Sequence, residues 1–303
     1  FDQHDCFGLD RADLTFFRQE MIPALDFSGR LILDSKEHVF ANPNGHGGSI
    51  TSLKSSGALA DMQARGIKHI FYFQVDNVLI KIADPVFLGY HAGREAEMSV
   101  KVAPKCGPEE KVGVVCLVDS TMTVIEYSDL PDELRYARNE DGSLKFSAGN
   151  LAIHTFDIDF IERVNSEKHS LPHHIAEKAL PLLDAEGKPV KPREKNGLKF
   201  EKFVFDALGL ARKAVVMEVA REEEFAPIKN AEGADSPATA RQMMAALYAG
   251  WLEEAGARVP RDSDGNPRGP IEISPLFALG AGELKEKLPL SFEVEYPLYL
   301  GPE

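Results

Sequence analysis

A nearly continuous run of apolar and aromatic residues from Ile67 to Val75 constrains the fold of this chain more than any other segment. A strand that is covered on both faces carries such a run, whereas a half-exposed strand alternates apolar and polar residues. We therefore expect a central strand over residues 67–75. Other short apolar segments alternate with helical patterns along the chain, and this alternation predicts an α/β fold.

Shorter patterns predict further strands. Short apolar or alternating runs bounded by Gly, Pro, Asp or Ser are typical of strands. Two such runs flank Asp119-Ser120, and a two-residue connection of this kind predicts a hairpin. The expected strands are residues 14–18, 30–33, 112–118, 121–127 and 214–219.

Two helices and a domain boundary are also expected. One helix runs from about Ser52 to Arg65, where Gly66 closes it. Another begins at Ser236-Pro237, since serine caps a helix and proline suits its first turn, and ends at Gly256. Residues 257–275 are rich in Pro, Gly and Asp. We therefore expect a main domain over residues 1–256, and a linker with a small C-terminal segment over residues 257–303.

Charge and cysteine content limit the classes of partner and compartment. The formal net charge is −14, which argues against nucleic acid and anionic membranes, because both attract clustered Lys and Arg. No apolar run is long enough to span a membrane, and residues 1–5 do not resemble a signal peptide. Cys6, Cys106 and Cys116 lack metal-binding spacing. These features predict a cytoplasmic protein in a reducing compartment.

Two segments are candidates for binding an anionic ligand. In Gly45-His46-Gly47-Gly48, glycines let backbone N–H groups approach a phosphate or a sugar hydroxyl closely, although a plain surface turn has the same pattern. Asp76 follows the predicted central strand, and ligands of open α/β sheets bind at carboxyl ends of strands. A carboxylate there can hold Mg²⁺, or Asp76 and Asn77 can simply cap the next segment.

Residues near the predicted hairpin suit a sugar. Gly113 lies within a strand pattern, which marks either a close approach of a ligand or a bulge. Glu126 can accept hydrogen bonds from neighbouring hydroxyls, and the Tyr127 ring can pack on a sugar face, unless the pair is an ordinary strand exit. In Ala148-Gly149-Asn150, small residues beside an amide leave room for a substituent and offer it a donor and an acceptor.

Lys199 and Lys229 are the candidate phosphate contacts. Lys229 follows three glutamates and Pro227, which stiffens the loop that presents the ammonium group. We expect that Glu223 and Glu224 are not both core residues. Lys199 lies in an alternating strand pattern, and a lysine is a compact charge suited to phosphate oxygens. A solvated surface position is the alternative for each lysine. We interpret His173-His174 as structural.

Several of these motifs resemble one family, the eukaryotic-type UDP-sugar pyrophosphorylases, and in particular the UDP-N-acetylglucosamine pyrophosphorylases. The resemblance covers almost the whole chain, and its motifs occur in the family's order. The motifs are Val75-Asp76-Asn77, Glu126-Tyr127-Ser128, Ala148-Gly149-Asn150, residues 200–206 and residues 221–230.

The resemblance implies a Rossmann-like, glycosyltransferase-A-like nucleotidyltransferase fold, with a mixed sheet flanked by helices. Residues 1–256 would then be part of the nucleotide-sugar-binding catalytic domain. The implied activity is Mg²⁺-dependent formation of UDP-N-acetylhexosamine and pyrophosphate from UTP and N-acetylglucosamine-1-phosphate. The roles implied are metal and nucleotide binding for Asp76, phosphate contacts for Lys199 and Lys229, nucleotide contact for Gly45, and sugar or ligand contacts for His46, Gly113, Glu126, Tyr127, Asn150 and Phe203.

The chain departs from the family pattern in two ways. His46 is typical of the glucose enzymes, since the acetylglucosamine enzymes usually carry Asn there, whereas Ala148-Gly149-Asn150 favours the acetylglucosamine type. We give the second motif more weight and keep UDP-glucose or a broad range of UDP-sugars as the alternative. The family's N-terminal Gly-Gly-x-Gly-Thr-Arg-Leu phosphate loop is absent from the sequence. We expect part of a longer enzyme that shows no turnover by itself, with a non-catalytic sugar-nucleotide-binding protein as the other hypothesis.

Overall fold

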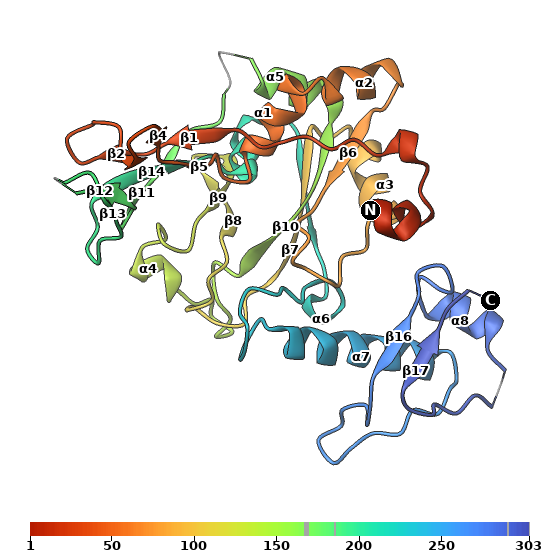
Figure 1. The fold of residues 1–303 in the computed structure, drawn as a ribbon. Helices are drawn as coiled ribbons and strands as arrows, with labels where there is room; N and C mark the ends of the chain where they lie inside the picture. The colour runs from red at the N-terminus through yellow and green to blue at the C-terminus, as the bar shows by residue number, and fades with distance from the viewer. Residues whose placement is uncertain (167–169, 185, 290, 303) are drawn as a thin grey trace.

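The computed structural model describes residues 1–166, 170–184, 186–289 and 291–302 and contains a six-stranded mixed sheet (Figure 1). Its strands are β6 (His69–Tyr72), β7 (Met98–Pro104), β8 (Val114–Val118), β9 (Thr121–Ile125), β10 (Ala148–Asp157) and β15 (Ala214–Glu218). The order is β15-β7-β10-β8-β9, and β6 pairs with the C-terminal half of β10. β15 is parallel to β7, whereas the other pairs are antiparallel.

Helices cover both faces of this sheet. The side chains of β7 alternate between the two faces, so this one strand contributes to a core on each side. On one face, Met98, Val100 and Val102 pack in a core with residues of three helices. These helices are α1 (Gly48–Ser55), α2 (Ala58–Ala64) and α5 (Ile158–Val164), which lie together at the top of Figure 1. On the other face, Ala103 packs near Phe87 of α3, which spans Pro85–Gly93. The result is a three-layer α/β arrangement.

Short strands and turns surround the main sheet. A three-stranded sheet has the order β11-β14-β2, and three two-stranded ribbons are β1-β5, β3-β4 and β12-β13. The strands are β1 (Met21–Pro23), β2 (Leu25–Asp26), β3 (Leu33–Ser35), β4 (His38–Val39), β5 (Ala41–Pro43), β11 (His174–Lys178), β12 (Leu182–Leu183), β13 (Pro189–Val190) and β14 (Gly197–Glu201). The short helices are η1 (Asp2–Gly8), η2 (Arg11–Asp13), η3 (Val204–Leu210), α4 (Asp132–Arg135) and α6 (Arg221–Glu224).

A second apolar core lies at the C-terminal end of the chain, in blue in Figure 1. Its elements are α7 (Pro237–Glu254), α8 (Ala281–Lys287) and the parallel strands β16 (Ile271–Ile273) and β17 (Leu298–Leu300). Ala249 and Leu252 of α7 pack there with Ile271 and Leu284. The described residues after 256 therefore form packed structure around the end of α7, and the boundary at residue 256 stays a prediction.

Several local predictions are confirmed. Asp119 and Ser120 adopt positive φ angles of 47° and 67° and join β8 to β9, as a tight hairpin requires. Ser236 caps α7 by accepting a hydrogen bond from the Thr239 N–H, and Thr239 bonds back to the Ser236 backbone. The predicted strand at residues 214–219 is β15.

Other predictions are wrong. The helix expected from Ser52 to Arg65 is two helices, because Gly57 adopts a positive φ of 82° between them. The strand expected over residues 67–75 shortens to β6, which pairs only with β10 among the described strands. Phe71 packs on Phe87 of α3 and Tyr72 packs on His154 and Phe156 of β10, but the strand is only half-buried. Residues 14–18 form no strand, and in the range 30–33 only Leu33 belongs to one.

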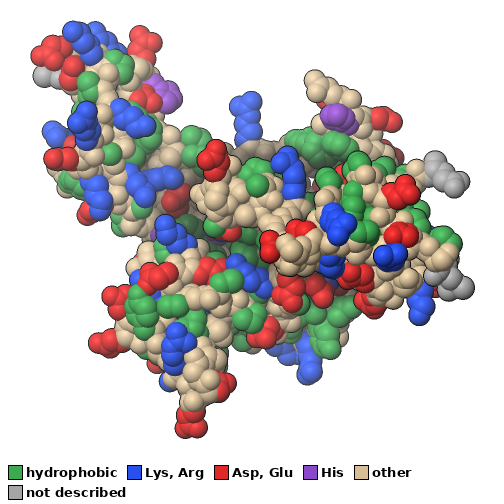
Figure 2. All heavy atoms as spheres, turned by 90° about the horizontal axis from the view of Figure 1, so that it is seen from below, with side chains coloured by type: hydrophobic (Ala, Val, Ile, Leu, Met, Phe, Trp, Pro, Cys, Tyr) green, Lys and Arg blue, Asp and Glu red, His purple; other side chains and the backbone are tan. Residues whose placement is uncertain are grey.

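The surface carries its charge in a mixed pattern. Figure 2 shows acidic and basic side chains interspersed over the face seen from below. The formal charge of −14 is therefore not gathered into one acidic patch on this face. None of the helices in the described ranges is both long and apolar enough to cross a membrane.

Candidate functional site

One cavity of about 180 Å³ lies where several chain segments meet at one end of the main sheet. The segments following β6 and β9 and those preceding β8 reach it, together with the start of β10 and the loop that follows α6. Its lining residues are His46, Gln74, Asp76, Asn77, Lys111, Val112, Gly113, Glu126, Asn150, Leu151, Ala152, Phe205, Phe225, Pro227 and Lys229. Carboxylate, ammonium, amide and imidazole groups thus share one small space.

The backbone around the glycine-rich loop fixes the position of His46. Gly45 has a positive φ of 63°, and a Cβ there would lie 2.3 Å from the Lys202 carbonyl oxygen. A Cβ at Gly47 would lie 2.7 Å from backbone atoms of Phe203. These two glycines therefore allow the loop to pack on residues 202–203. The structure gives Gly45 this packing position, and it does not lie among the described residues that line the cavity.

The His46 imidazole is held as a neutral hydrogen-bond donor. Its Nδ1 accepts a hydrogen bond of 3.1 Å from the Val204 N–H, so the proton of the neutral ring resides on Nε2. The ring stacks on Phe203, with 5.2 Å between ring centroids. Burial lowers the pKa of His46 to about 4. Near pH 7, His46 therefore offers an uncharged N–H group.

Gly113 allows the Glu126 carboxylate to approach β8. A Cβ at Gly113 would lie 3.2 Å from Glu126 Oε1 and 2.9 Å from Val124 Cγ1, so a larger residue would push the carboxylate away. Burial raises the pKa of Glu126, since desolvation disfavours its charged form. A ligand that donates hydrogen bonds would compensate this carboxylate for the water it has lost.

A β-bulge presents Asn150 to the cavity. The register between β10 and β7 shifts between Asn150 and His154, and Ala152 adopts a positive φ of 55°. Bulges of this kind redirect side chains near functional sites. The Asn150 N–H donates to the Gly113 carbonyl at 2.8 Å, and Asn150 Oδ1 accepts from the Ala152 N–H at 3.1 Å. The Asn150 NH₂ group is then the part of the amide that a ligand can use.

Backbone hydrogen bonds join the segments that carry Asp76 and Lys229. The Ile228 N–H donates to the Asp76 carbonyl at 2.8 Å, and Asn77 forms an antiparallel bridge with Pro227. The Lys229 N–H donates to the Asp235 carbonyl at 2.8 Å. The Lys229 ammonium group lies 5.8 Å from the centre of the Phe225 ring. Residues distant in the sequence thus present a carboxylate and an ammonium group to the same cavity.

The structure brings together six of the ten predicted site residues and separates four from the cavity lining. His46, Asp76, Gly113, Glu126, Asn150 and Lys229 line the cavity, whereas Gly45, Tyr127, Lys199 and Phe203 are not among its described lining residues. The Phe203 ring stacks on the His46 ring. Tyr127 is 39% exposed beside Glu126. Lys199 lies on β14 and pairs with Glu201 at 2.8 Å. The role of each residue stays a prediction.

Sequence reasoning missed Lys111 and Gln74, which also line the cavity. Lys111 directly precedes Val112-Gly113, but a single lysine in a polar stretch carries no signal of its own. It also missed Lys101, the charged residue of the mostly apolar strand β7. A lysine in a buried strand needs carboxylates as partners. Its presence in this strand pattern could therefore have predicted a buried ion pair.

The mixed sheet with helices on both faces, and a polar cavity at one of its ends, define a nucleotidyltransferase-like α/β protein. The family model of UTP–glucose-1-phosphate uridylyltransferase matches residues 5–248, and the chain belongs to this family. The predicted family and fold are confirmed.

Relatives refine this assignment. The chain is 41% identical to human UDP-N-acetylhexosamine pyrophosphorylase-like protein 1, covering 100% of this chain and 62% of the relative. It is 38% identical to UDP-N-acetylglucosamine pyrophosphorylase of Saccharomyces cerevisiae, covering 86% of this chain and 56% of the relative. A solved structure from Entamoeba histolytica, assigned to the UDP-N-acetylglucosamine pyrophosphorylases, superposes with a TM-score of 0.87 at 34% identity, covering 99% of this chain and 74% of that chain. The chain therefore spans about three fifths of the length of these curated relatives.

Proposed function

We propose that this chain forms the sugar-nucleotide-binding part of a uridylyltransferase that makes UDP-N-acetylhexosamine and pyrophosphate from UTP and an N-acetylhexosamine-1-phosphate. The observation that carries the proposal is the meeting of Asp76, Asn150 and Lys229 in one cavity. A phosphate needs cations, a sugar needs hydrogen-bonding groups, and an acetamido group needs an amide partner. The names of the relatives support the N-acetylhexosamine class.

In the proposed reaction, an oxygen of the sugar-1-phosphate attacks the α-phosphorus of UTP. A new P–O bond forms, and the bond to the pyrophosphate leaving group breaks with its electron pair. The attacking oxygen is already anionic, so no protein base has to remove a proton. The work of the protein is to align the two phosphates and to neutralise their charge. Lys229 and Lys111 supply positive charge, and His46, Glu126 and Asn150 hold the sugar through hydrogen bonds.

Mg²⁺ fits this site as an ion shared with substrate phosphates. Asp76 offers a hard carboxylate oxygen and Gln74 an amide oxygen at the cavity wall. In the described ranges, no group of three His, Cys, Asp or Glu side chains could hold a metal ion. Bound Mg²⁺ would therefore take its remaining ligands from phosphates and water, and it would supply further charge neutralisation.

The cytoplasmic location stays a prediction that follows from the cysteine content.

Calorimetric titration of this chain tests the proposal. We expect UDP-N-acetylglucosamine to bind more tightly than UDP-glucose, and both to bind more tightly than UMP. Binding of UDP-glucose alone would favour the alternative that His46 suggests, a UTP–glucose-1-phosphate uridylyltransferase. The absence of binding of any UDP-sugar would contradict the proposal. If the encoding gene also carries the phosphate loop, a turnover assay of the complete protein distinguishes an enzyme from a non-catalytic sugar-nucleotide-binding protein.

A change at His46 tests how the sugar is selected. The His46→Asn variant replaces an Nε2–H donor by a shorter amide, and it is expected to shift the ratio of the dissociation constants of UDP-glucose and UDP-N-acetylglucosamine toward the N-acetyl sugar. The shift should be about fivefold, which corresponds to one hydrogen bond of ~1 kcal/mol. Competition titration measures the ratio. A ratio that changes less than about twofold, well below one hydrogen bond, would remove His46 from sugar selection.

Matched lysine variants decide which second cation contacts phosphate. Lys111→Met is expected to weaken UDP-N-acetylglucosamine binding about tenfold, because a charge-assisted hydrogen bond contributes ~1.5 kcal/mol. Lys199→Met is expected to change the same dissociation constant less than about twofold, since Glu201 already pairs with Lys199. The reverse order of effects would support Lys199 as the phosphate contact.

A further inference from the structure

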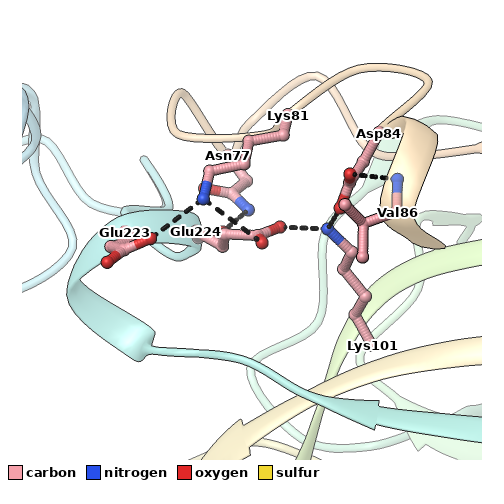
Figure 3. Close-up of polar contacts among 7 residues, drawn as sticks. All are labelled: Asn77, Lys81, Asp84, Val86, Lys101, Glu223 and Glu224. Atoms are coloured by element: carbon pink, nitrogen blue, oxygen red, sulfur yellow. Dashed lines mark hydrogen bonds and ion pairs between the residues drawn. The ribbon is translucent and has the colours of Figure 1, made fainter. Parts of the chain in front are cut away.

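A fully buried lysine lies beside the candidate site. Lys101 of β7 has an exposed fraction of 0%, and its ammonium group lies 2.6 Å from Asp84 Oδ2 and 2.5 Å from Glu224 Oε2 (Figure 3). Asp84 caps the N-terminus of α3 by accepting from the Val86 N–H at 2.9 Å, and Glu224 ends α6. One ammonium group therefore links the central sheet to the start of α3 and the end of α6.

This arrangement brings no evident gain in packing. A buried ion pair repays its desolvation only with good geometry, and an apolar side chain of similar volume is often at least as stabilising. Burial acts to raise the pKa of Asp84, but the hydrogen bond and charge of Lys101 hold it below its usual value. Glu224 is buried, whereas Glu223 is exposed and pairs with Lys81 at 2.9 Å. The prediction that the two glutamates are not both core residues is thus confirmed.

Contacts lead from this lysine to the two segments that carry Asp76 and Lys229. The Asn77 Nδ2 donates to the Glu224 carbonyl at 2.8 Å, and Asn77 Oδ1 accepts from the Ala226 N–H at 2.9 Å. Figure 3 shows the Asn77 side chain lying between the segment that carries Lys81 and the one that carries Glu224. Two further backbone contacts join the same segments. The Ile228 N–H donates to the Asp76 carbonyl, and Asn77 forms a β-bridge with Pro227.

We propose that Lys101 is a positioning residue for the phosphates of the ligand. By holding Asp84 and Glu224 on one ammonium group, it fixes residues 76–84 against residues 221–229. This contact sets how Asp76 and Lys229 face each other across the cavity. The identity of the ligand rests on the proposed function, whereas the link between the two segments does not.

Hydrogen exchange tests the link without any ligand. In the Lys101→Met variant, the Ala226 and Ile228 amides are expected to exchange at least about tenfold faster, because their segment opens locally. Amides of β11, β14 and the middle of α7 should keep their rates. The control is Lys54→Met, which removes an exposed pair with Glu162 on other elements and should leave the exchange of both amides unchanged. Unchanged exchange at both amides, or equally faster exchange throughout the chain, would overturn the proposal.

Ligand titration then tests the consequence for phosphate binding. Lys101→Met is expected to weaken UDP-N-acetylglucosamine binding at least about tenfold and uridine binding less than about twofold, since a small misplacement of charged groups affects the phosphates most. Equal losses for both ligands would indicate a merely structural role and would contradict the proposal. Should Lys101→Met fail to fold, Glu224→Gln tests the same link, because it keeps the side-chain shape and removes one charge. If the unmodified protein does not bind UDP-N-acetylglucosamine, the proposed function fails, and hydrogen exchange still decides the role of Lys101.

Discussion

Replacing Lys229 by alanine is expected to lower the rate of uridylyl transfer at least about tenfold, because the change removes a charge-assisted contact to phosphate. Lys229 lines the same cavity as the groups suited to the sugar, and its loop is hydrogen-bonded to the segment of Asp76. The side chain is therefore presented by a fixed backbone. Turnover is measured in the complete enzyme, and the dissociation constant of UDP-N-acetylglucosamine is measured with this chain.

Lys213→Ala is the matched control for this experiment. Lys213 precedes β15 at the opposite end of that strand from the Lys229 loop and pairs with Glu95 at 2.7 Å on the surface. Removal of this exposed ion pair should have little effect on stability and should leave ligand binding unchanged. If Lys229→Ala and Lys213→Ala both keep the rate of the unmodified enzyme, Lys229 does not contact the reacting phosphates.

Acidification from about pH 6.5 to pH 4 is expected to destabilise the folded chain strongly through three histidines, the fully buried His91 and His154 and the half-buried His46. Burial lowers the pKa of His46 and His91 to about 4 and that of His154 to about 3. In the unfolded chain these groups take up protons near pH 6.5, so the unfolded state binds more protons over this interval. The free energy of unfolding therefore falls as the pH falls, by about 2–4 kcal/mol per pH unit. Above about pH 7.5 all three are almost entirely neutral in both states and contribute little pH dependence.

His154→Phe isolates the largest of these contributions. Both ring nitrogens of His154 lack a hydrogen-bond partner among the described residues, and the ring stacks on Tyr72 at 5.7 Å between centroids. Phenylalanine keeps the ring and cannot take up a proton, so the variant should lose ~1 kcal/mol per pH unit of acid sensitivity. Urea unfolding at pH 7.5 and pH 5 measures the difference, with the exposed His4→Phe as control. An identical pH slope in His154→Phe and the unmodified chain would contradict this account.

Elements with local signals could be predicted from the sequence. Asp119-Ser120 specifies a two-residue turn and Ser236-Pro237 a capped helix start, because each depends on residues that are neighbours in the chain. The break at Gly57 was missed, since a helical pattern continues on both sides of it. The length of β6 was overestimated, because the apolar run continues past Tyr72 into Phe73 and Val75, which are exposed and belong to no strand.

The site was predictable in composition but not in arrangement. Asp76, Asn150 and Lys229 were found through family motifs, whereas their shared cavity depends on contacts between distant segments. The same limit applies to the position of Lys199. Its alternating strand pattern did not indicate that β14 belongs to a separate sheet, where it pairs with β11 and β2. Lys101 was overlooked for a related reason. Its partners lie at positions 84 and 224, so only the folded chain shows why a lysine can occupy that strand.

The helix α7 connects the Lys229 loop to the C-terminal core. It begins two residues after Asp235, whose carbonyl accepts a hydrogen bond from the Lys229 N–H, and its other end buries Ala249 and Leu252 among C-terminal side chains. A shortened protein ending near Gly256 would expose that apolar surface to water and would leave the helix unsupported at one end. Residues 257–302, although none of those described lines the cavity, would then be required to keep its lysine in place.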